Sequence, residues 1–428
     1  MIILRNGVAI IALVFDMNVI KHSGYKDFVW AVEINRIGLE LIGLWPNETI
    51  KNTFVSDLRM GMIFFIVTFL SIIPLLCSLI RVWGNMILVV DNLQVTLPLL
   101  VVSLKIIIMR WNRTAIALFV KMMAEDWMEL KIDAERKIMI RRAQTARLVV
   151  ICGYILMIFV FIVLIILPSF GLHFRYVTNE TDQKRLLPFQ SYYFYDTDKS
   201  PQFEFALVIQ ATTMFLGAIT YTSVDAFLGL VILHICGQLE NFKHRLVNLT
   251  SCKDFDSALR NNVRTHQRII RFANNIEDTF TLMMLGLVFY FGIVFCLFGF
   301  LLVTVIAGDE IGRMSLTRVC FLMIGIFTLV AHTFLYCGAG EIIAKQSEAV
   351  YRAMCNLKWY KLEPRKEKNL ILLMMRANEP FYITAGKIFP LTMTTFCSVR
   401  LIIYLLNILL IRNLCIFQLI LINKLFHE

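Results

Sequence analysis

The chain has 428 residues, of which 58% are hydrophobic, and its 42 Lys and Arg residues outnumber its 31 Asp and Glu residues, for a formal net charge of +11. An ordinary soluble domain is about half apolar, so this chain carries more apolar surface than one soluble core can bury and is expected to need lipid. In a membrane protein the basic excess indicates cytoplasmic loops, and we expect no nucleic-acid partner.

Seven stretches have the length and low charge of transmembrane helices, which need roughly 20 apolar residues. The second stretch contains Asp91 and Lys105 near its ends, where we expect the carboxylate to meet water and the lysine to extend towards the interface. We see no paired charges within the stretches, which argues against a transporter or a membrane enzyme. In chain order the seven predicted helices are Met60–Ile80, Met86–Met109, Val149–Phe170, Phe205–Ile235, Thr279–Gly308, Val319–Gly340 and Lys387–Arg412.

The basic residues alternate between the connections and predict the orientation of the chain. The connections after the second, fourth and sixth stretches carry nine, seven and eight Lys or Arg residues, whereas the other three carry one, four and two. By the positive-inside rule, the amino terminus and the basic connections are cytoplasmic and the carboxyl terminus is outside. This orientation is opposite to that of a G-protein-coupled receptor.

The connections carry two further signals. The longest predicted outer connection, Gly171–Gln202, holds an N-glycosylation acceptor at Asn179. Two cytoplasmic connections, Ala115–Arg142 and Leu239–Glu277, alternate apolar and charged residues at helical spacing, which predicts helices that continue beyond the membrane. The expected fold is therefore all-α: a seven-transmembrane helix bundle with a cytoplasmic amino terminus and helical cytoplasmic extensions.

Enzyme signatures are missing from the sequence. There is no G-x-S-x-G, no H-E-x-x-H and no phosphate-binding glycine loop, and the seven histidines form no pair at ligand spacing. We therefore expect no enzyme activity, no cofactor and no metal. In the fourth stretch His234 and Gln238 share a helix face, while Asp225 lies half a turn away; polar packing where the helix leaves the bilayer is favoured over a metal or proton-relay site.

The stretch Phe334–Val399 is the most distinctive part of the chain. It contains FLYCGAGEIIAKQSEAVY, the basic aromatic segment NLKWYKLEPRKEK, the run NLILLMMRANEP and the words TAGKIFPLT. This sequence closely resembles the last two helices and the connecting loop of insect odorant receptors. The resemblance covers roughly residues 17–399.

The resemblance implies a receptor subunit that binds a small volatile odorant and assembles with the family's co-receptor into a hetero-tetramer. Such tetramers are ligand-gated, non-selective cation channels in the plasma membrane of olfactory sensory neuron dendrites. The short connection between the fourth and fifth stretches looks like that of a ligand-tuning subunit, because the co-receptor has a longer one. An apolar ligand pocket would lie among the outer halves of the second, third, fourth and sixth helices, where each candidate residue could instead be simple helix packing. The candidates are Gln94, Met157, Phe161, Gln210, Met214 and Met323.

The segment between the sixth and seventh stretches resembles the family's cytoplasmic anchor, through which subunits contact each other. Independently of the resemblance, the six apolar residues from Leu370 to Met375 are flanked by basic residues and need cover from a partner or from lipid. An inward-folded helix is the alternative. The candidate contact residues are Trp359, Tyr360, Leu370, Leu373 and Met374.

The last stretch resembles the helix that lines the ion pathway in the family's tetramers, with Thr394 and Ser398 as candidate pore residues. After Val399 the resemblance fails, so we interpret residues 400–428 as a doubtful carboxyl-terminal segment. Residues 1–16 are similarly interpreted as a doubtful amino-terminal extension, with the receptor domain spanning 17–412. A G-protein-coupled receptor and a gustatory-type receptor remain the alternative functions.

Overall fold

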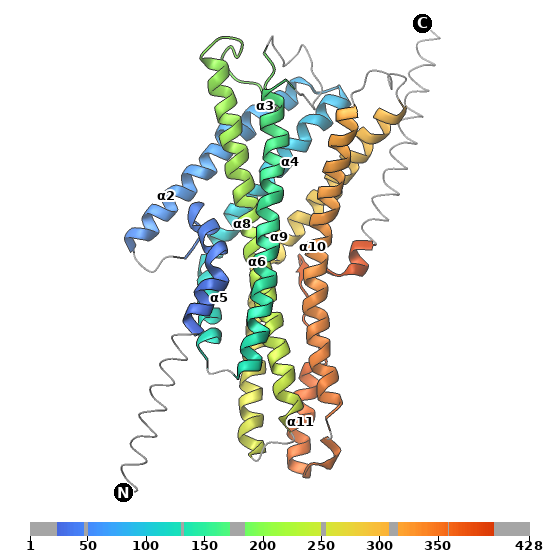
Figure 1. The fold of residues 1–428 in the computed structure, drawn as a ribbon. Helices are drawn as coiled ribbons and strands as arrows, with labels where there is room; N and C mark the ends of the chain where they lie inside the picture. Colours follow the sequence, from blue (N-terminus) through green and yellow to red (C-terminus); the bar gives the residue numbers. More distant parts are fainter. Residues whose placement is uncertain are drawn as a thin grey trace.

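The computed structural model describes residues 24–46, 50–129, 132–171, 185–249, 254–307, 316–357 and 359–397. These residues form an elongated bundle of long helices (Figure 1). We call the end at which α11 (Pro364–Ala377) lies the inner end, since the sequence predicts it to be cytoplasmic, and the opposite end the outer end. Asn179, Ser398, residues 1–16 and residues 400–428 lie outside the described residues. All the anchor candidates and ligand candidates lie within them.

The helices follow one another in chain order. A first helix covers residues 24–41 and precedes α2. The remaining elements are α2 (Ile50–Val67), the π-helical turn η1 (Thr68–Ile72), α3 (Ile73–Arg81), α4 (Met86–Trp111), α5 (Arg113–Met128), α6 (Asp133–Phe161), the π-helical turn η2 (Ile162–Ile166), α7 (Leu167–Ser169), α8 (Gln202–Val247), α9 (Phe255–Ala307), α10 (Leu316–Cys355), the 3₁₀ turn η4 (Trp359–Lys361), α11, and the strands β1 (Thr384–Ala385) and β2 (Phe389–Pro390).

Six stretches of the described residues are long and apolar enough to cross a membrane, and they contain or overlap the first six predicted helices. They are Thr53–Arg81, Met86–Trp111, Asp133–Ser169, Gln202–Val247, Phe255–Leu302 and Val319–Cys355. Because α8, α9 and α10 have 46, 53 and 40 residues, each is longer than the roughly 20 residues that a bilayer requires. The predicted all-α bundle with helical extensions is confirmed. Both predicted extensions are interrupted, however. α5 ends at Met128 and α6 begins at Asp133, and likewise α8 ends at Val247 and α9 begins at Phe255.

Two π-helical turns stand next to prolines. Pro74 follows η1 and Pro168 follows η2, each at the start of the next α-helical piece. A proline has no backbone N–H and cannot bond the carbonyl four residues earlier, which for these two residues falls inside the π turn. A local widening of the helix keeps α2 and α3, and likewise α6 and α7, continuous instead of broken.

The predicted seventh helix does not begin at Lys387, and this part of the prediction was wrong. Residues 384–390 form an antiparallel hairpin in which Thr384 pairs with Pro390 and Ala385 pairs with Phe389. Gly386 and Lys387 have positive φ values of 63° and 59°, a conformation that excludes an α-helix at this point. Helical backbone resumes at residues 393–397, and the rest of the predicted helix lies outside the described residues.

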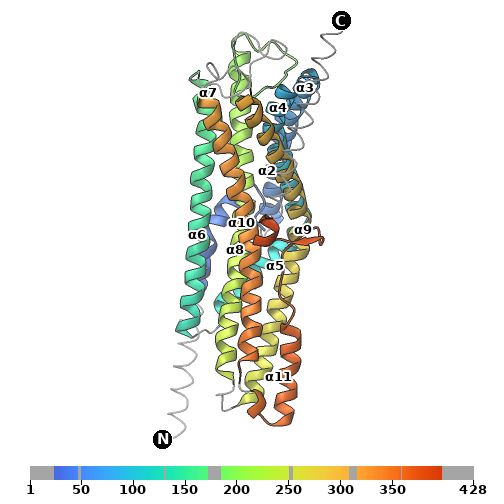
Figure 2. The same cartoon turned by 90° about the vertical axis from the view of Figure 1, so that its right-hand side faces the viewer.

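α8 is the central helix of the bundle and packs against α6, α10, α9 and α4. In Figure 2, α6 lies on one side of α8 and α9 on the other, with α10 in front. Close approach depends on small residues: a Cβ added at Gly217 would lie 3.3 Å from Leu99, and one at Gly237 would lie 2.8 Å from the Met139 sulfur. α8 therefore positions every other long helix.

Gly340 on α10 provides a test of how tightly the segment after the hairpin is held. A Cβ at Gly340 would lie 2.1 Å from the Leu391 carbonyl oxygen, which is backbone and cannot rotate away. We expect Gly340→Ala to destabilise the protein by about 1–3 kcal/mol through overpacking, measured as a lower melting temperature of the purified receptor. The matched control is Gly338→Ala, whose Cβ would meet only the mobile end of Met393 at 3.2 Å. Equal melting temperatures for the two variants would contradict the close packing.

Candidate functional site

A buried ion pair joins α4 to α8. Lys105 on α4 is 0% exposed, and its Nζ lies 2.5 Å from Oδ1 of Asp225 on α8. The same Nζ lies 3.4 Å from the hydroxyl of Tyr336 on α10 and 3.3 Å from the centroid of the Tyr221 ring. The expectation that Lys105 extends to the interface was wrong, as was the expectation that paired charges are missing from the membrane stretches. A lysine removed from water needs such a partner because an uncompensated buried charge is very costly.

The ion pair also sets the alignment of α4 with α8. Both helices run from the outer to the inner end (Figure 1), and about two turns outward from Asp225, Gly217 faces Leu99. Gln94 precedes Lys105 by eleven residues and Met214 precedes Asp225 by eleven residues, which in each case is about three helical turns. Gln94 and Met214 therefore lie on the faces that carry the ion pair, at similar levels in the outer half of the bundle.

The other predicted ligand residues occupy different environments. Met157, Phe161 and Met214 are partly buried against the core, and the Phe161 ring packs edge-on against Phe215 at 5.7 Å. Gln94 is also partly buried, and its Nε2 is buried with no hydrogen-bond partner among the described residues. Met323 on α10 is 53% exposed in the single chain. Four of the candidates are therefore partly buried, whereas Met323 lies on the outside of the bundle.

Gln210 holds the outer connection. Its Oε1 accepts a hydrogen bond from the Phe189 N–H at 3.1 Å, and its Nε2 donates to the Phe189 carbonyl at 3.3 Å and to Ser191 Oγ at 3.1 Å. Asn92, which sequence reasoning missed, donates from Nδ2 to the carbonyls of Leu75 at 3.2 Å and Gln190 at 3.1 Å. These two amides fasten residues 189–191 across the outer ends of α3, α4 and α8.

Aromatic residues continue this cover. The Arg81 guanidinium lies 3.5 Å from the centroid of the Tyr192 ring, and the Tyr193 and Tyr195 rings stack at 5.3 Å. Burial raises the pKa of the Tyr193 phenol to about 12. The phenol, neutral at physiological pH like any tyrosine, therefore stays neutral in more alkaline solution as well.

Ion pairs tie together the inner ends of the helices. His234 on α8 lies 2.9 Å from Asp126 on α5, and Asp126 also accepts a hydrogen bond from Arg268 on α9 at 2.8 Å. Arg245 pairs with Glu135 at 2.7 Å, which links α8 to α6. The predicted polar set on α8 is thus divided, because Asp225 pairs with Lys105 whereas His234 joins a separate cluster. Among the described residues, no group of three or more His, Cys, Asp or Glu side chains is arranged to hold a metal ion.

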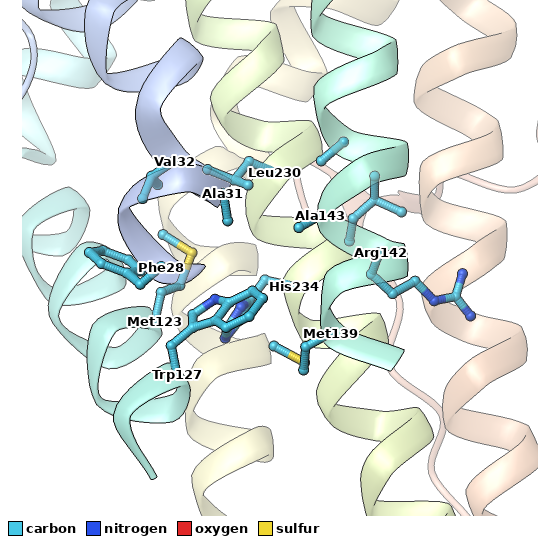
Figure 3. Close-up of a pocket in the computed structure, with 12 residues that line it drawn as sticks. Phe28, Ala31, Val32, Met123, Trp127, Met139, Arg142, Ala143, Leu230 and His234 are labelled. Carbon is cyan, nitrogen blue, oxygen red and sulfur yellow. The ribbon is translucent and has the colours of Figure 1, made fainter. Parts of the chain in front are cut away.

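A pocket lies beside this inner cluster, between residues 24–41, α5, α6 and α8 (Figure 3). The free space accommodates about one water molecule, which is far less than an odorant requires. None of the predicted ligand residues lines it. Its lining residues are Phe28, Ala31, Val32, Met123, Trp127, Met139, Arg142, Ala143, Ala146, Leu230, Leu233 and His234.

The anchor segment has an inward and an outward side. Leu370 and Leu373 are buried and Met374 and Trp359 are partly buried, all within the chain's own core. Tyr360, Leu372 and Met375 are 63%, 57% and 67% exposed. This pattern follows from helical spacing, which rotates each residue by about 100° from the one before, so that residues three or four apart share a side. Of the predicted contact residues, Tyr360 is the one that clearly faces outward.

The hairpin is fastened to α9. Glu277 accepts hydrogen bonds from the Thr384 backbone N–H, at 2.9 Å, and from the Thr384 hydroxyl. The Gly386 N–H donates to the Thr281 carbonyl at 3.0 Å, and Lys387 Nζ lies 2.9 Å from Asp278. Thr394, the predicted pore residue within the described part, is exposed in the short helical turn that follows. The hairpin therefore fixes the backbone a few residues before Thr394.

The Lys105–Asp225 pair gives a prediction for stability. Lys105→Met or Asp225→Leu alone leaves one buried charge without a partner, so we expect each variant to lose about 3–5 kcal/mol of stability. The double variant should recover most of this loss, because a well-packed apolar pair of similar volume can replace a buried ion pair. Melting temperature and surface expression measure the effect, with the exposed Lys121→Met as the control. A double variant as unstable as the sum of the single variants would contradict the direct pairing.

Comparisons with solved structures identify the fold. The insect olfactory receptor OR5 from Machilis hrabei, solved in complex with eugenol, matches with a TM-score of 0.76 at 18% sequence identity, covering 90% of this chain and 99% of that chain. A second structure of the same receptor, for which no ligand is named, matches with a TM-score of 0.74. The described helices therefore have the seven-transmembrane fold of insect olfactory receptors.

Sequence comparisons point to the same group. The chain is 25% identical to Odorant receptor 10 of Aedes albopictus over 210 residues, and 25% identical to Odorant receptor Or2 of Anopheles gambiae over 214 residues. Each match covers 47% of this chain and 54% of the relative, so the chain spans about half the length of these curated relatives. The family model described as 7tm Odorant receptor matches residues 85–404. The chain therefore belongs to the 7tm odorant receptor family.

Proposed function

We propose that this odorant receptor is a ligand-tuning subunit that binds a small volatile odorant and, with the family's co-receptor, forms a ligand-gated, non-selective cation channel in the plasma membrane of olfactory sensory neurons. The family match over residues 85–404 is the observation that carries the proposal, since it includes α4, α8, α10, the anchor and the hairpin. The short connection between Val247 and Phe255 favours the ligand-tuning subunit over the co-receptor.

The outer half of the bundle is where we place the odorant. Gln94, Met157, Phe161 and Met214 are partly buried there, and flexible Met side chains can adapt to a small apolar molecule. A receptor of the same fold has been solved with eugenol, which is itself a small volatile compound. Odorant binding would open the channel only to the extent that the open conformation binds the odorant more tightly than the closed one.

The anchor supports assembly with a second kind of subunit. Tyr360, Leu372 and Met375 expose apolar surface at the inner end, and such surface calls for cover by a partner. The buried or partly buried side of the anchor would support this surface from within the chain. It consists of Trp359, Leu370, Leu373 and Met374. In the same assembly Thr394 and Ser398, which follow the hairpin in the chain, would face the ion pathway.

Co-expression tests the proposed function. We expect odour-evoked cation currents when this chain and a co-receptor are present in the same cell, and the odorant preference should depend on this chain. Leu372→Asp, which places a charge on the exposed anchor surface, should reduce the current at least about tenfold by weakening assembly, because one buried unpaired charge costs several kcal/mol. Lys121→Asp is the control, since Lys121 is an exposed residue of α5. Surface-expressed receptor that gives no current with a broad odorant panel would contradict the proposal.

Topology provides a separate test. The basic connections predict Asn179 outside and Asn47 inside the cell. We therefore expect glycosidase treatment to change the mobility of the wild-type receptor and to leave an Asn179→Gln variant unchanged, with Asn47→Gln behaving as the wild type. Glycosylation at Asn47 alone would instead favour the orientation of a G-protein-coupled receptor.

A further inference from the structure

Gln94 is a hydrogen-bonding side chain without a partner in the described part of the chain. Its Nε2 is buried and meets no acceptor there. Two nearby amides of the outer half are well bonded, since Asn92 donates to two carbonyls and Gln210 bonds Phe189 and Ser191. A buried donor that gave up water without gaining an acceptor is destabilising. Gln94 is therefore a candidate to bind something other than this chain.

The surroundings of Gln94 belong to the helix faces that meet at the Lys105–Asp225 pair. Each of Gln94 and Met214 lies eleven residues outward from that pair along its own helix, which is about three turns or roughly 16 Å of helix. Between the pair and this level, a Cβ added at Gly217 would lie 3.3 Å from Leu99 and 3.9 Å from Val102, so α4 and α8 pack closely there. Gln94 and Met214 thus lie on the packed sides of two neighbouring helices, and both are partly buried.

The charge state of this region selects the kind of ligand. Lys105 and Asp225 already neutralise each other at the inner end of the two faces. A carboxylate or an ammonium ligand would have to be buried at the level of Gln94 and Met214 beside neutral side chains, which is strongly unfavourable. A neutral molecule with one oxygen acceptor satisfies the Nε2 donor and leaves its apolar part for Met214.

We propose that Gln94 donates a hydrogen bond to the oxygen of a neutral odorant such as an alcohol, an ester or a phenol ether, and so makes the receptor prefer oxygenated compounds to hydrocarbons of the same shape. The inference rests on the proposed function and names the chemical class of its ligand. Met214 contributes contact area to both classes of compound, and Gln94 discriminates between them.

Paired odorants of equal heavy-atom count test the preference in cells that express this chain and a co-receptor. The pairs are octanol with nonane, anisole with ethylbenzene, and butyl acetate with methylheptane. We expect Gln94→Met, which keeps the side-chain length but removes the donor, to raise the half-maximal concentration of the oxygenated member about tenfold, equivalent to one lost hydrogen bond, and to leave the hydrocarbon unchanged. Met214→Leu is the control and should shift both members alike.

The outcomes separate the two proposals. If Gln94→Met changes the responses to the oxygenated compound and the hydrocarbon of each pair equally, or changes neither, the proposed role of Gln94 is wrong. The odorant receptor function would still stand. A silent panel with surface-expressed receptor would contradict the odorant receptor function instead.

A second measurement needs no odorant response. If Nε2 is an unpaired donor in the ligand-free receptor, Gln94→Met should keep or raise the melting temperature of the purified protein, because it removes a buried polar group without breaking a bond. Asn92→Leu, which breaks two hydrogen bonds to the outer connection, should lower it. A melting temperature for Gln94→Met as low as that of Asn92→Leu would show that Gln94 is bonded within the chain and would overturn the inference.

Discussion

The contact between Lys105 and Asp225 constrains the whole bundle. A lysine that is 0% exposed within a membrane-spanning helix requires its counter-ion at one place, so α4 and α8 cannot slide past one another without separating the charges. Tyr336 brings α10 to the same point at 3.4 Å. Apolar packing against lipid specifies helix register weakly, because one aliphatic side chain can replace another, whereas this pair specifies it sharply. The level of every residue on the facing sides of these helices follows from it.

On either side of the ion pair the bundle uses different interactions. The inner half is cross-linked by charged groups from α5, α6, α8 and α9, including Asp126, Arg268 and Glu135. The outer half depends on apolar contacts and on two amides that fasten the connection at residues 189–191. Apolar contacts are individually small and easily rearranged, while a broken buried ion pair is costly. The outer half is therefore better suited to accept a ligand, and the inner half to keep the helices in place while it does.

Sequence reasoning found the helices but not the contacts between them. The first six membrane helices are evident from apolar length, and the resemblance of residues 334–399 identified the family before the fold was known. The partner of Lys105 is 120 residues away, and no local pattern indicates a pair at that separation. The hairpin was missed for a similar reason: residues 387–397 read as apolar helix, but Glu277 and Thr281 on α9 bind the backbone at Thr384 and Gly386 and hold it in another conformation. Gln210 was proposed as a ligand residue, whereas its amide bonds Phe189 and Ser191 of the outer connection.

The backbone that precedes Thr394 is held by both α9 and α10. Residues 384–387 are bonded to α9 through Glu277, Asp278 and Thr281, and Leu391 lies against Gly340 of α10 with too little space for a methyl group. Because residues 384–391 are bound to α9 and packed against α10, a shift of one helix relative to the other would displace this backbone. Because α10 also meets the Lys105–Asp225 pair through Tyr336, a rearrangement of α4, α8 and α10 under the proposed function would reach the hairpin through packed side chains and backbone hydrogen bonds. Rigid contacts of this kind transmit a displacement to the segment beyond residue 391, whereas a flexible linker would not.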